Sequence, residues 1–263
     1  MNFLYPLFAG LFGLLIGSFL NVVIYRLPRG RSIVRPRSHC PRCRRLIRSY
    51  DNIPLVSFLL LKGRCRSCRK PISWRYPLVE MISGLLALLV SWKFTDPLVG
   101  AAYYLFFVAP LIVVSGIDFR HKIIPNRITL PGILIGLWIS FWLGGWHIGS
   151  LLHSFLGAIT GGGALFLVGF CYEKLRGVEG LGMGDVKLAA MLGAYFGWNG
   201  VLFILLISSL LGSVIGLILL LVFKKGRTEP IPYGPFLSLA GLIQLFFGKE
   251  LIGFYLNLSN KLY

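Results

Sequence analysis

The chain has 263 residues, of which 56% are hydrophobic and 14% are charged, and its mean hydropathy is +0.77. Soluble domains carry about 25% charged residues, so this composition excludes an ordinary soluble domain, a coiled coil, a disordered chain and a secreted disulfide scaffold. The 27 Lys and Arg residues against 9 Asp and Glu residues give a net charge of +18. Such a surplus suits either a nucleic-acid-binding protein or the cytoplasmic loops of a membrane protein.

Apolar segments of membrane-spanning length recur from end to end, so the sequence predicts an all-α, polytopic membrane bundle of about eight transmembrane helices. In chain order, we expect spans at 3–25, 77–92, 98–117, 128–144, 151–172, 186–198, 201–223 and 231–247. The sixth span is short, and with the seventh it could form a broken or re-entrant pair. The first lacks the flanking features of a cleaved signal peptide, so we expect it to remain as an anchor.

The distribution of basic residues predicts the orientation of these spans. If the long loop 26–76 is cytoplasmic, 24 of the 27 Lys and Arg residues fall on that side, in 26–76, 118–127, 173–187 and 224–230. Lys93, Lys249 and Lys261 fall on the other side. The positive-inside rule then predicts that the N-terminus lies outside. The same distribution weakens the nucleic-acid interpretation, because the basic residues lie where membrane topology requires them.

Four of the five cysteines form two C-x-x-C pairs, Cys40 with Cys43 and Cys65 with Cys68, separated by 21 residues. Four thiolates complete a tetrahedral site and leave no open position, so the pattern predicts a structural Zn²⁺ in a cytoplasmic loop domain. The loop has few apolar residues, and a metal would supply the folding free energy that a core cannot. The alternative is two reduced pairs used for redox exchange.

Two aspartates lie at helix ends on the expected cytoplasmic boundary. Asp118 ends the third span in V-S-G-I-D-F-R, and Asp185 opens the sixth in G-L-G-M-G-D-V-K. Two carboxyl groups around one water can act as base and acid, which suits hydrolysis without a metal or a covalent nucleophile. Gly182 and Gly184 would leave the backbone there open to an extended substrate. The alternatives are a solvated Asp118 paired with nearby cations and an Asp185 that caps its helix.

Five motifs in order carry a resemblance to a known family. They are G-S-F-L-N-V-V-I-Y-R-L-P at 17–28, the four-cysteine loop at 40–68, D-F-R-H-K-I-I-P-N at 118–126, G-M-G-D-V-K at 182–187 and I-P-Y-G-P-F-L-S at 231–238. In these motifs, over nearly its whole length, the sequence resembles the bacterial type IV prepilin peptidases, aspartic proteases of the G-x-G-D class.

The resemblance implies an endopeptidase that removes the basic leader from type IV prepilins and pseudopilins at the cytoplasmic face of the bacterial inner membrane. Asp118 and Asp185 match the catalytic pair. It also implies methylation of the new N-terminus with S-adenosylmethionine, although no nucleotide-type glycine loop marks where this cofactor binds. The expected domains are an anchor helix at 1–27, a zinc loop associated with methyl transfer at 28–76, and a peptidase core at 77–263.

Local contacts must attract the substrate, because leader and enzyme are both basic. Glu179 is a candidate for binding the leader, and Lys122 or Lys187 for binding a glutamate that family substrates carry after the cut. We expect the anionic bilayer as a second partner and no nucleic acid. Two other functions stay open at this point. A transporter or channel would place its acids near the bilayer midplane, and a non-enzymatic, zinc-bearing assembly scaffold would need no acid pair.

Overall fold

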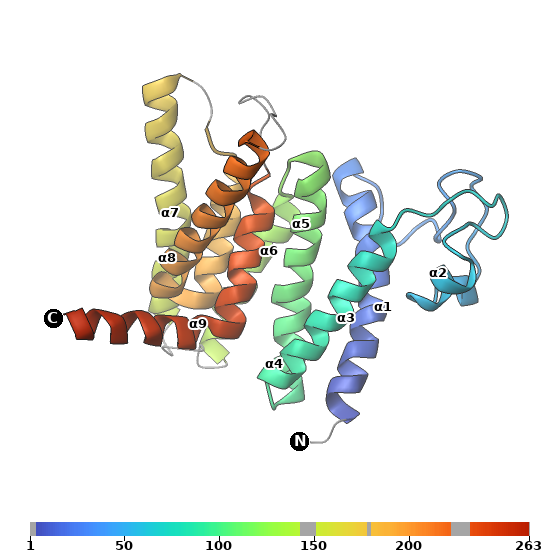
Figure 1. Ribbon diagram of the computed structural model, residues 1–263, viewed down its shortest axis with the longest axis horizontal. Helices are drawn as coiled ribbons and strands as arrows, with labels where there is room; N and C mark the ends of the chain where they lie inside the picture. Colours follow the sequence, from blue (N-terminus) through green and yellow to red (C-terminus); the bar gives the residue numbers. More distant parts are fainter. Residues whose placement is uncertain (1–3, 143–150, 178–179, 222–231, 263) are drawn as a thin grey trace. The chain divides into compact units, whose positions relative to one another are not determined.

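The computed structural model describes residues 4–142, 151–177, 180–221 and 232–262, and within them the regular structure is helical apart from two isolated β-bridges. This confirms the all-α class. The chain divides into two compact units, Met1–Ile117 and Asp118–Tyr263. Figure 1 shows the helices of both units.

The first unit contains two long helices joined by the cysteine-rich loop. The long helices are α1 (Leu4–Arg26) and α3 (Arg75–Lys93), and they pack against each other. The loop carries the short helices η1 (Leu27–Arg29), η2 (Ser49–Asn52) and α2 (Val56–Leu60). After α3 the chain continues through α4 (Pro97–Tyr103), the π-helical turn η3 (Tyr104–Val108) and α5 (Ala109–His121), whose last residues begin the second unit.

Glycines bring α1 and α3 to backbone contact. A Cβ atom on Gly13 would lie 2.5 Å from the Cβ of Ala87, and one on Gly17 would lie 2.8 Å from the Cα of Glu80. The Ser83 hydroxyl lies in the same contact and donates a hydrogen bond of 2.7 Å to the carbonyl of Gly13. Small residues at a helix contact allow this approach in lipid, where apolar burial does not drive helices together.

The second unit is arranged around one long helix. Its helices are α6 (Asn126–Trp142), α7 (Leu151–Arg176), α8 (Met183–Leu221) and α9 (Gly234–Leu262), and α8 packs against the other three. Gly197 interrupts α8 with φ 70° and ψ −177°, so two helices meet at a kink. This confirms the break expected between the sixth and seventh apolar segments.

Glycines also set the contacts of α8 with α6 and α7. On α7, a Cβ atom on Gly157 would collide with the backbone of Gly193, and one on Gly161 would lie 2.5 Å from the carbonyl oxygen of Ala189. These contacts hold α7 and α8 at backbone distance, so the side chains between them must be absent or small.

On α6, Gly132 faces Met191, whose Sδ would lie 2.5 Å from an added Cβ, and Gly136 faces Tyr195, whose Cδ2 would lie 2.8 Å away. Moving four residues forward on α6, from Gly132 to Gly136, also moves the contact four residues forward on α8, from Met191 to Tyr195. The two helices therefore run parallel. The first turns of these two helices therefore lie at the same end of the unit.

Within the described residues, five helical segments are long and apolar enough to cross a membrane: Leu4–Arg29, Arg75–Lys93, Pro97–His121, Leu151–Arg176 and Met183–Leu221. A shorter apolar helix covers Gly234–Gly248. The protein is thus an integral membrane protein, whereas the number of crossings stays a prediction. The expected basic loop 224–230 lies outside the described residues.

The α7–α8 contact generates a stability prediction. We expect Gly157→Ala to lower the free energy of unfolding by about 1–3 kcal/mol, because the new methyl group would overlap the backbone of α8. Gly163→Ala is the matched control on the same helix, because a Cβ atom there meets nothing within 4 Å. Thermal unfolding of the purified protein in detergent measures both variants. Equal midpoints for the two would contradict the close packing.

Candidate active site and metal centre

Asp118 is held by the start of another helix. Its side chain is 5% exposed, and Oδ2 accepts a hydrogen bond of 2.9 Å from the backbone N–H of Gly234, the first residue of α9. The first N–H groups of a helix have no acceptor within that helix, so the carboxyl group supplies one. The sequence analysis left open that Asp118 pairs with nearby cations. The partner that the structure describes is instead a backbone N–H group.

The start of α9 is itself anchored on α8. The Tyr233 hydroxyl lies 2.8 Å from the Ser208 hydroxyl and 3.3 Å from that of Ser209, both on α8. Because Tyr233 is anchored in this way, the N–H of the next residue, Gly234, is presented to Asp118 from a fixed position. Pro235, which follows, has no N–H that could compete for the carboxyl group.

Asp185 is the third residue of α8, so it lies inside the first turn and is not the N-cap residue. Its backbone N–H donates to the carbonyl of Gly182 at 3.0 Å. Its half-buried carboxyl group lies beside Gly182, since a Cβ atom on Gly182 would be 3.3 Å from Oδ2 of Asp185. Asp185 thus lies in the first turn of α8, next to Gly184.

Ile124 fills the space between the turns that carry this pair. A Cβ atom on Gly184 would lie 2.9 Å from the Cβ of Ile124, and one on Gly234 would lie 3.1 Å from its Cδ1. Close packing on both sides fixes the spacing of Gly184 and Gly234. Sequence reasoning missed Ile124 and Gly234, although Gly234 lies in the quoted motif at 231–238.

The other candidate residues differ in exposure and in hydrogen-bond partners. Gly182 is exposed beside the Asp185 carboxyl group. Lys122 is exposed just after α5, and its N–H donates to the carbonyl of Asp118 at 2.9 Å. The Lys187 ammonium group donates to the side-chain oxygen of Asn126 at 3.0 Å, so it already has a partner. Glu179 lies outside the described residues.

The four predicted cysteine ligands converge in the loop of the first unit. Their Sγ atoms, from Cys40, Cys43, Cys65 and Cys68, all lie within 4.8 Å of one another. Sulfur atoms around a tetrahedral zinc at 2.3 Å would be about 3.8 Å apart, and the Sγ atoms of Cys40 and Cys68 are 3.9 Å apart. The donor set therefore fits a metal ion.

The two C-x-x-C pairs have the same backbone structure. The N–H of Cys40 donates to the carbonyl of Arg45 at 3.0 Å, and the N–H of Cys65 donates to that of Lys70 at 2.9 Å. A backbone hydrogen bond from Cys68 lowers the pKa of the Cys65 thiol to about 7. Metal ligation requires the thiolate, which Cys65 forms near neutral pH, whereas burial and the neighbouring thiols raise the pKa of Cys68 to about 11.

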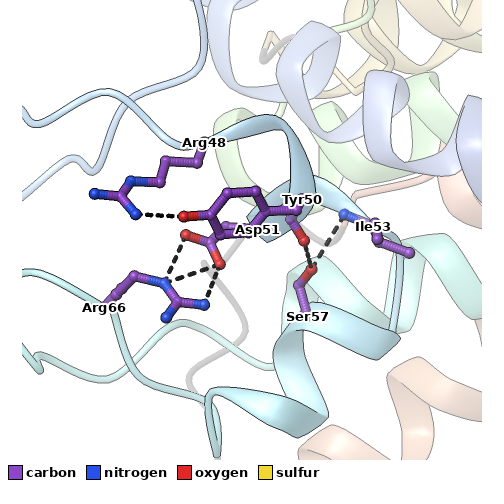
Figure 2. A network of polar contacts seen from close by, with 6 residues as sticks. All are labelled: Arg48, Tyr50, Asp51, Ile53, Ser57 and Arg66. Atoms are coloured by element: carbon purple, nitrogen blue, oxygen red, sulfur yellow. Dashed lines mark hydrogen bonds and ion pairs between the residues drawn. The ribbon is translucent and has the colours of Figure 1, made fainter.

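A polar network joins Arg66 to η2 and to the start of α2 (Figure 2). Arg66, which follows Cys65, makes a two-pronged ion pair with Asp51 whose shortest distance is 2.7 Å. The guanidinium group holds the pKa of the Asp51 carboxyl group below its usual range. Ser57 of α2 donates to the carbonyl of Tyr50 at 2.9 Å, so η2 and α2 are bound together beside the ion pair.

A buried acid then connects α2 to the membrane helix α3. Glu80 is 8% exposed, and its Oε2 accepts a hydrogen bond of 2.9 Å from the N–H of Leu55. Leu55 has a positive φ of 59°, which is unfavourable for a leucine. The loop is thus fixed by polar contacts and its cysteine cluster, while Leu59 and Leu60 of α2 are 72% and 77% exposed.

Comparisons with known proteins match both units. Residues 11–94 match the bacterial peptidase A24 N-terminal domain, and residues 105–217 match the type IV leader peptidase family. The chain is 38% identical to the prepilin leader peptidase/N-methyltransferase of Aeromonas salmonicida over 282 residues, 98% of this chain and 96% of the relative. Relatives of the same name from Stutzerimonas stutzeri and Pseudomonas aeruginosa are also 38% identical, covering 97% and 95% of this chain and 95% and 92% of the relatives. No solved structure matches significantly.

The cysteine geometry predicts about one bound metal ion per chain. We expect Cys65→Ser to lose most of this metal, since three thiolates leave the tetrahedron incomplete. Cys171→Ser is the matched control, because Cys171 lies exposed on α7 and outside the cluster. Elemental analysis of the purified, full-length variants by mass spectrometry measures the metal content. Equal content in Cys65→Ser and wild type would exclude a four-cysteine site.

Proposed function

Because the chain belongs to the type IV leader peptidase family, we propose that it is a membrane aspartic endopeptidase that removes the leader from type IV prepilins and pseudopilins. The observation that carries this proposal is the packing of Ile124 against both Gly184, which precedes Asp185, and Gly234, whose N–H binds Asp118. Two carboxyl groups that meet around one water share one proton, because ionising both is costly. One can then act as a base while the other acts as an acid.

The chemistry follows from this shared proton. The ionised carboxylate takes a proton from a water molecule, the water attacks the scissile carbonyl, and the protonated carboxyl group donates to the carbonyl oxygen. The tetrahedral species then collapses, and the leaving amine takes up a proton. The N–H of Gly234 orients the Asp118 carboxyl group, which limits the positions that the attacking water can occupy. Because water is the nucleophile, no acyl-enzyme forms.

The exposed backbone at Gly182 supports its role as a docking site for an extended substrate next to Asp185. Lys122 is exposed and so is free to contact an acidic substrate residue after the cut. Lys187 would first have to leave Asn126, which makes it the weaker candidate of the two lysines. Glu179 remains the candidate that binds the basic leader.

The proposed setting is the bacterial inner membrane, with the N-terminus outside and the aspartate pair at the cytoplasmic face. The basic loop residues support this orientation, because cytoplasmic loops and the anionic inner leaflet both favour Lys and Arg. The substrate would then place its apolar helix in the bilayer and its leader in the cytoplasm. This geometry brings the scissile bond to the depth of the two carboxyl groups.

We also propose methyl transfer to the new N-terminus, with the domain division given above: anchor helix, four-cysteine loop and peptidase core. In this proposal the cluster holds Zn²⁺ as a structural ion, since four thiolates would fill its coordination. S-adenosylmethionine would supply the methyl group. The described residues include no glycine-rich loop that could be assigned to this donor, and its binding residues stay unassigned.

The alternative functions have less support. An ion pathway would need acids near the bilayer midplane, whereas Asp118 and Asp185 lie at helix ends. A scaffold would give no reason for two carboxyl groups to approach each other at a cost in electrostatic energy.

Single substitutions of the pair separate the two proposed activities. We expect Asp118→Asn and Asp185→Asn each to reduce prepilin cleavage by at least about 100-fold, since proton transfer needs both groups. Methylation of a pre-cleaved substrate by a labelled donor should persist in both variants, because the first unit and its cysteine cluster are intact. Both reactions are measured with purified protein, and retained folding is checked by thermal unfolding. Cleavage at the wild-type rate in either variant would exclude the two-aspartate mechanism.

The contact of Gly234 with Asp118 predicts a rate effect. A Cβ atom at position 234 would lie 2.8 Å from Oδ2 of Asp118, so we expect Gly234→Ala to displace this carboxyl group and lower kcat about 10- to 100-fold. Gly253→Ala is the control on the same helix, since a Cβ atom there meets nothing within 4 Å. If the two variants cleave prepilin equally well, Gly234 does not position Asp118.

A further inference from the structure

The short helix α2 in the cysteine loop presents an exposed apolar surface. Leu59 and Leu60 are largely exposed, and Trp74, the residue before α3, is 75% exposed. Phe58 of α2 packs edge-on against the Trp74 ring, with 4.9 Å between the ring centres. The apolar side chains of α2 and Trp74 therefore belong to one surface, and we call Leu59, Leu60 and Trp74 the α2 face.

The α2 face lies at the level of the first turns of α3, a helix of membrane-spanning length. The N–H of Leu55, directly before α2, donates to Glu80, the sixth residue of α3. At a rise of about 1.5 Å per residue, Glu80 is about 8 Å along α3 from Arg75. The 19 residues of α3 extend over about 28 Å, close to the thickness of the hydrocarbon core. The start of α2 is therefore level with the boundary between headgroups and hydrocarbon.

The chain around the α2 face carries an excess of positive charge. Between Asp51 and Glu80 the sequence has no acidic residue and six basic ones, which are Lys62, Arg64, Arg66, Arg69, Lys70 and Arg75. Arg66 pairs with Asp51, and the other five are exposed and form no ion pair within the described residues. An apolar surface bordered by uncompensated cations is typical of a segment that lies in an anionic membrane surface.

A cavity of about 520 Å³ joins the α2 face to these cations. Its lining combines two leucines with four basic side chains, namely Leu60, Leu61, Lys62, Arg64, Arg66 and Arg69. Guanidinium and ammonium groups bind phosphate oxygens through charge-assisted hydrogen bonds. The leucines offer an apolar contact to a carbon chain attached to that phosphate. The lining thus suits a ligand that is anionic at one end and apolar at the other.

We propose that this cavity binds the phosphate group of an anionic phospholipid while the α2 face inserts into the headgroup boundary. In the proposed orientation this is the cytoplasmic leaflet, which is rich in anionic lipid. The proposal goes beyond the peptidase function and does not depend on it. It assigns the expected contact with the anionic bilayer to a defined site on the cysteine loop.

The charge of the cavity disfavours the other ligands proposed for this protein. S-adenosylmethionine carries a sulfonium and an ammonium group against one carboxylate, so its net charge is positive. The prepilin leader is basic as well. Four cations in one cavity repel both of these ligands and attract an anion. An anionic lipid is therefore the occupant that the charge of the lining favours.

Lipid binding to the purified, full-length protein tests the cavity. By native mass spectrometry of the protein in detergent, we expect the first phosphatidylglycerol to bind at least about fivefold more tightly than phosphatidylcholine. We expect Lys62→Gln combined with Arg64→Gln to lower the affinity for phosphatidylglycerol about 10- to 30-fold, since each cation near the phosphate contributes about fivefold. The same variant should bind phosphatidylcholine as the wild type does.

Arg31→Gln combined with Arg37→Gln is the matched control, because both arginines are exposed in the same loop and outside the cavity lining. We expect this variant to keep its affinity for phosphatidylglycerol within about threefold, since distant exposed charges are screened. Metal content and unfolding temperature should be unchanged in both double variants, because all four side chains are exposed. Equal losses of affinity in the two would overturn the proposal and leave only a diffuse attraction of the loop to anionic lipid.

Two further ligands distinguish the possible sources of a bound anion. Inorganic phosphate that binds as tightly as phosphatidylglycerol would overturn the lipid assignment, because the leucines would then contribute nothing. S-adenosylmethionine that binds the wild type and is lost in the Lys62→Gln and Arg64→Gln double variant would overturn it too. We expect neither ligand to displace phosphatidylglycerol.

Photo-crosslinking in a bilayer tests the insertion and leaves every cation of the cavity in place. A benzophenone amino acid replaces Leu60 in the full chain, and the protein is placed in nanodiscs that contain phosphatidylglycerol. We expect mass spectrometry to detect a lipid adduct at this position after illumination. If position 60 forms no lipid adduct, or crosslinks only to the protein itself, α2 faces water or another helix and the proposal is wrong.

Discussion

Backbone-distance packing around the first half of α8 is the constraint on which the second unit depends. Lipid offers helices no hydrophobic reason to associate, so their contact energy comes from close van der Waals approach. Gly157 and Gly161 provide that approach from α7, and Gly132 and Gly136 provide it from α6. With α8 held on two sides, the first turn that carries Asp185 has a defined position, and so has the end of the unit at which Asp118 lies.

Unsatisfied groups at helix ends do the remaining positioning. A helix begins with N–H groups that need acceptors, and water does not reach the N–H of a buried first residue such as Gly234. The start of α9 therefore needs a polar partner, and Asp118 provides it through Gly234. Tyr233 completes the arrangement by anchoring the same turn to Ser208. The second unit places a carboxyl group by using backbone and hydroxyl groups, which leaves Lys122 exposed and available for other contacts.

The cysteine-rich loop of the first unit is stabilised differently, because it has no hydrophobic core of its own. The exposed leucines of α2 show that apolar burial does not hold the loop together. The loop is held instead by polar contacts and its cysteines: four convergent sulfur atoms, the Asp51–Arg66 ion pair and the hydrogen bond from Leu55 to Glu80. Glu80 lies on the helix that packs against α1. The loop is thus attached to the membrane helices by polar contacts, in a unit of its own.

The sequence by itself determined the features that depend on one segment at a time. Apolar runs predicted the helices, and the cysteine spacing predicted the cluster. The places of Asp118 and Asp185 at the ends of apolar runs made them the candidate site residues. The short sixth segment, 186–198, also suggested a broken pair with the seventh, although it did not indicate that the kink would lie at Gly197, inside that segment.

Only the tertiary structure decided the features that depend on two distant segments. Asp118 and Gly234 are 116 residues apart, and no local pattern states that an N–H group of one will reach the carboxyl group of the other. The same holds for Ile124 between Gly184 and Gly234 and for Asn126 on Lys187. Hydrogen bonding and close packing act over a few ångströms in space, so they are fixed only when the helices that carry them have been brought together.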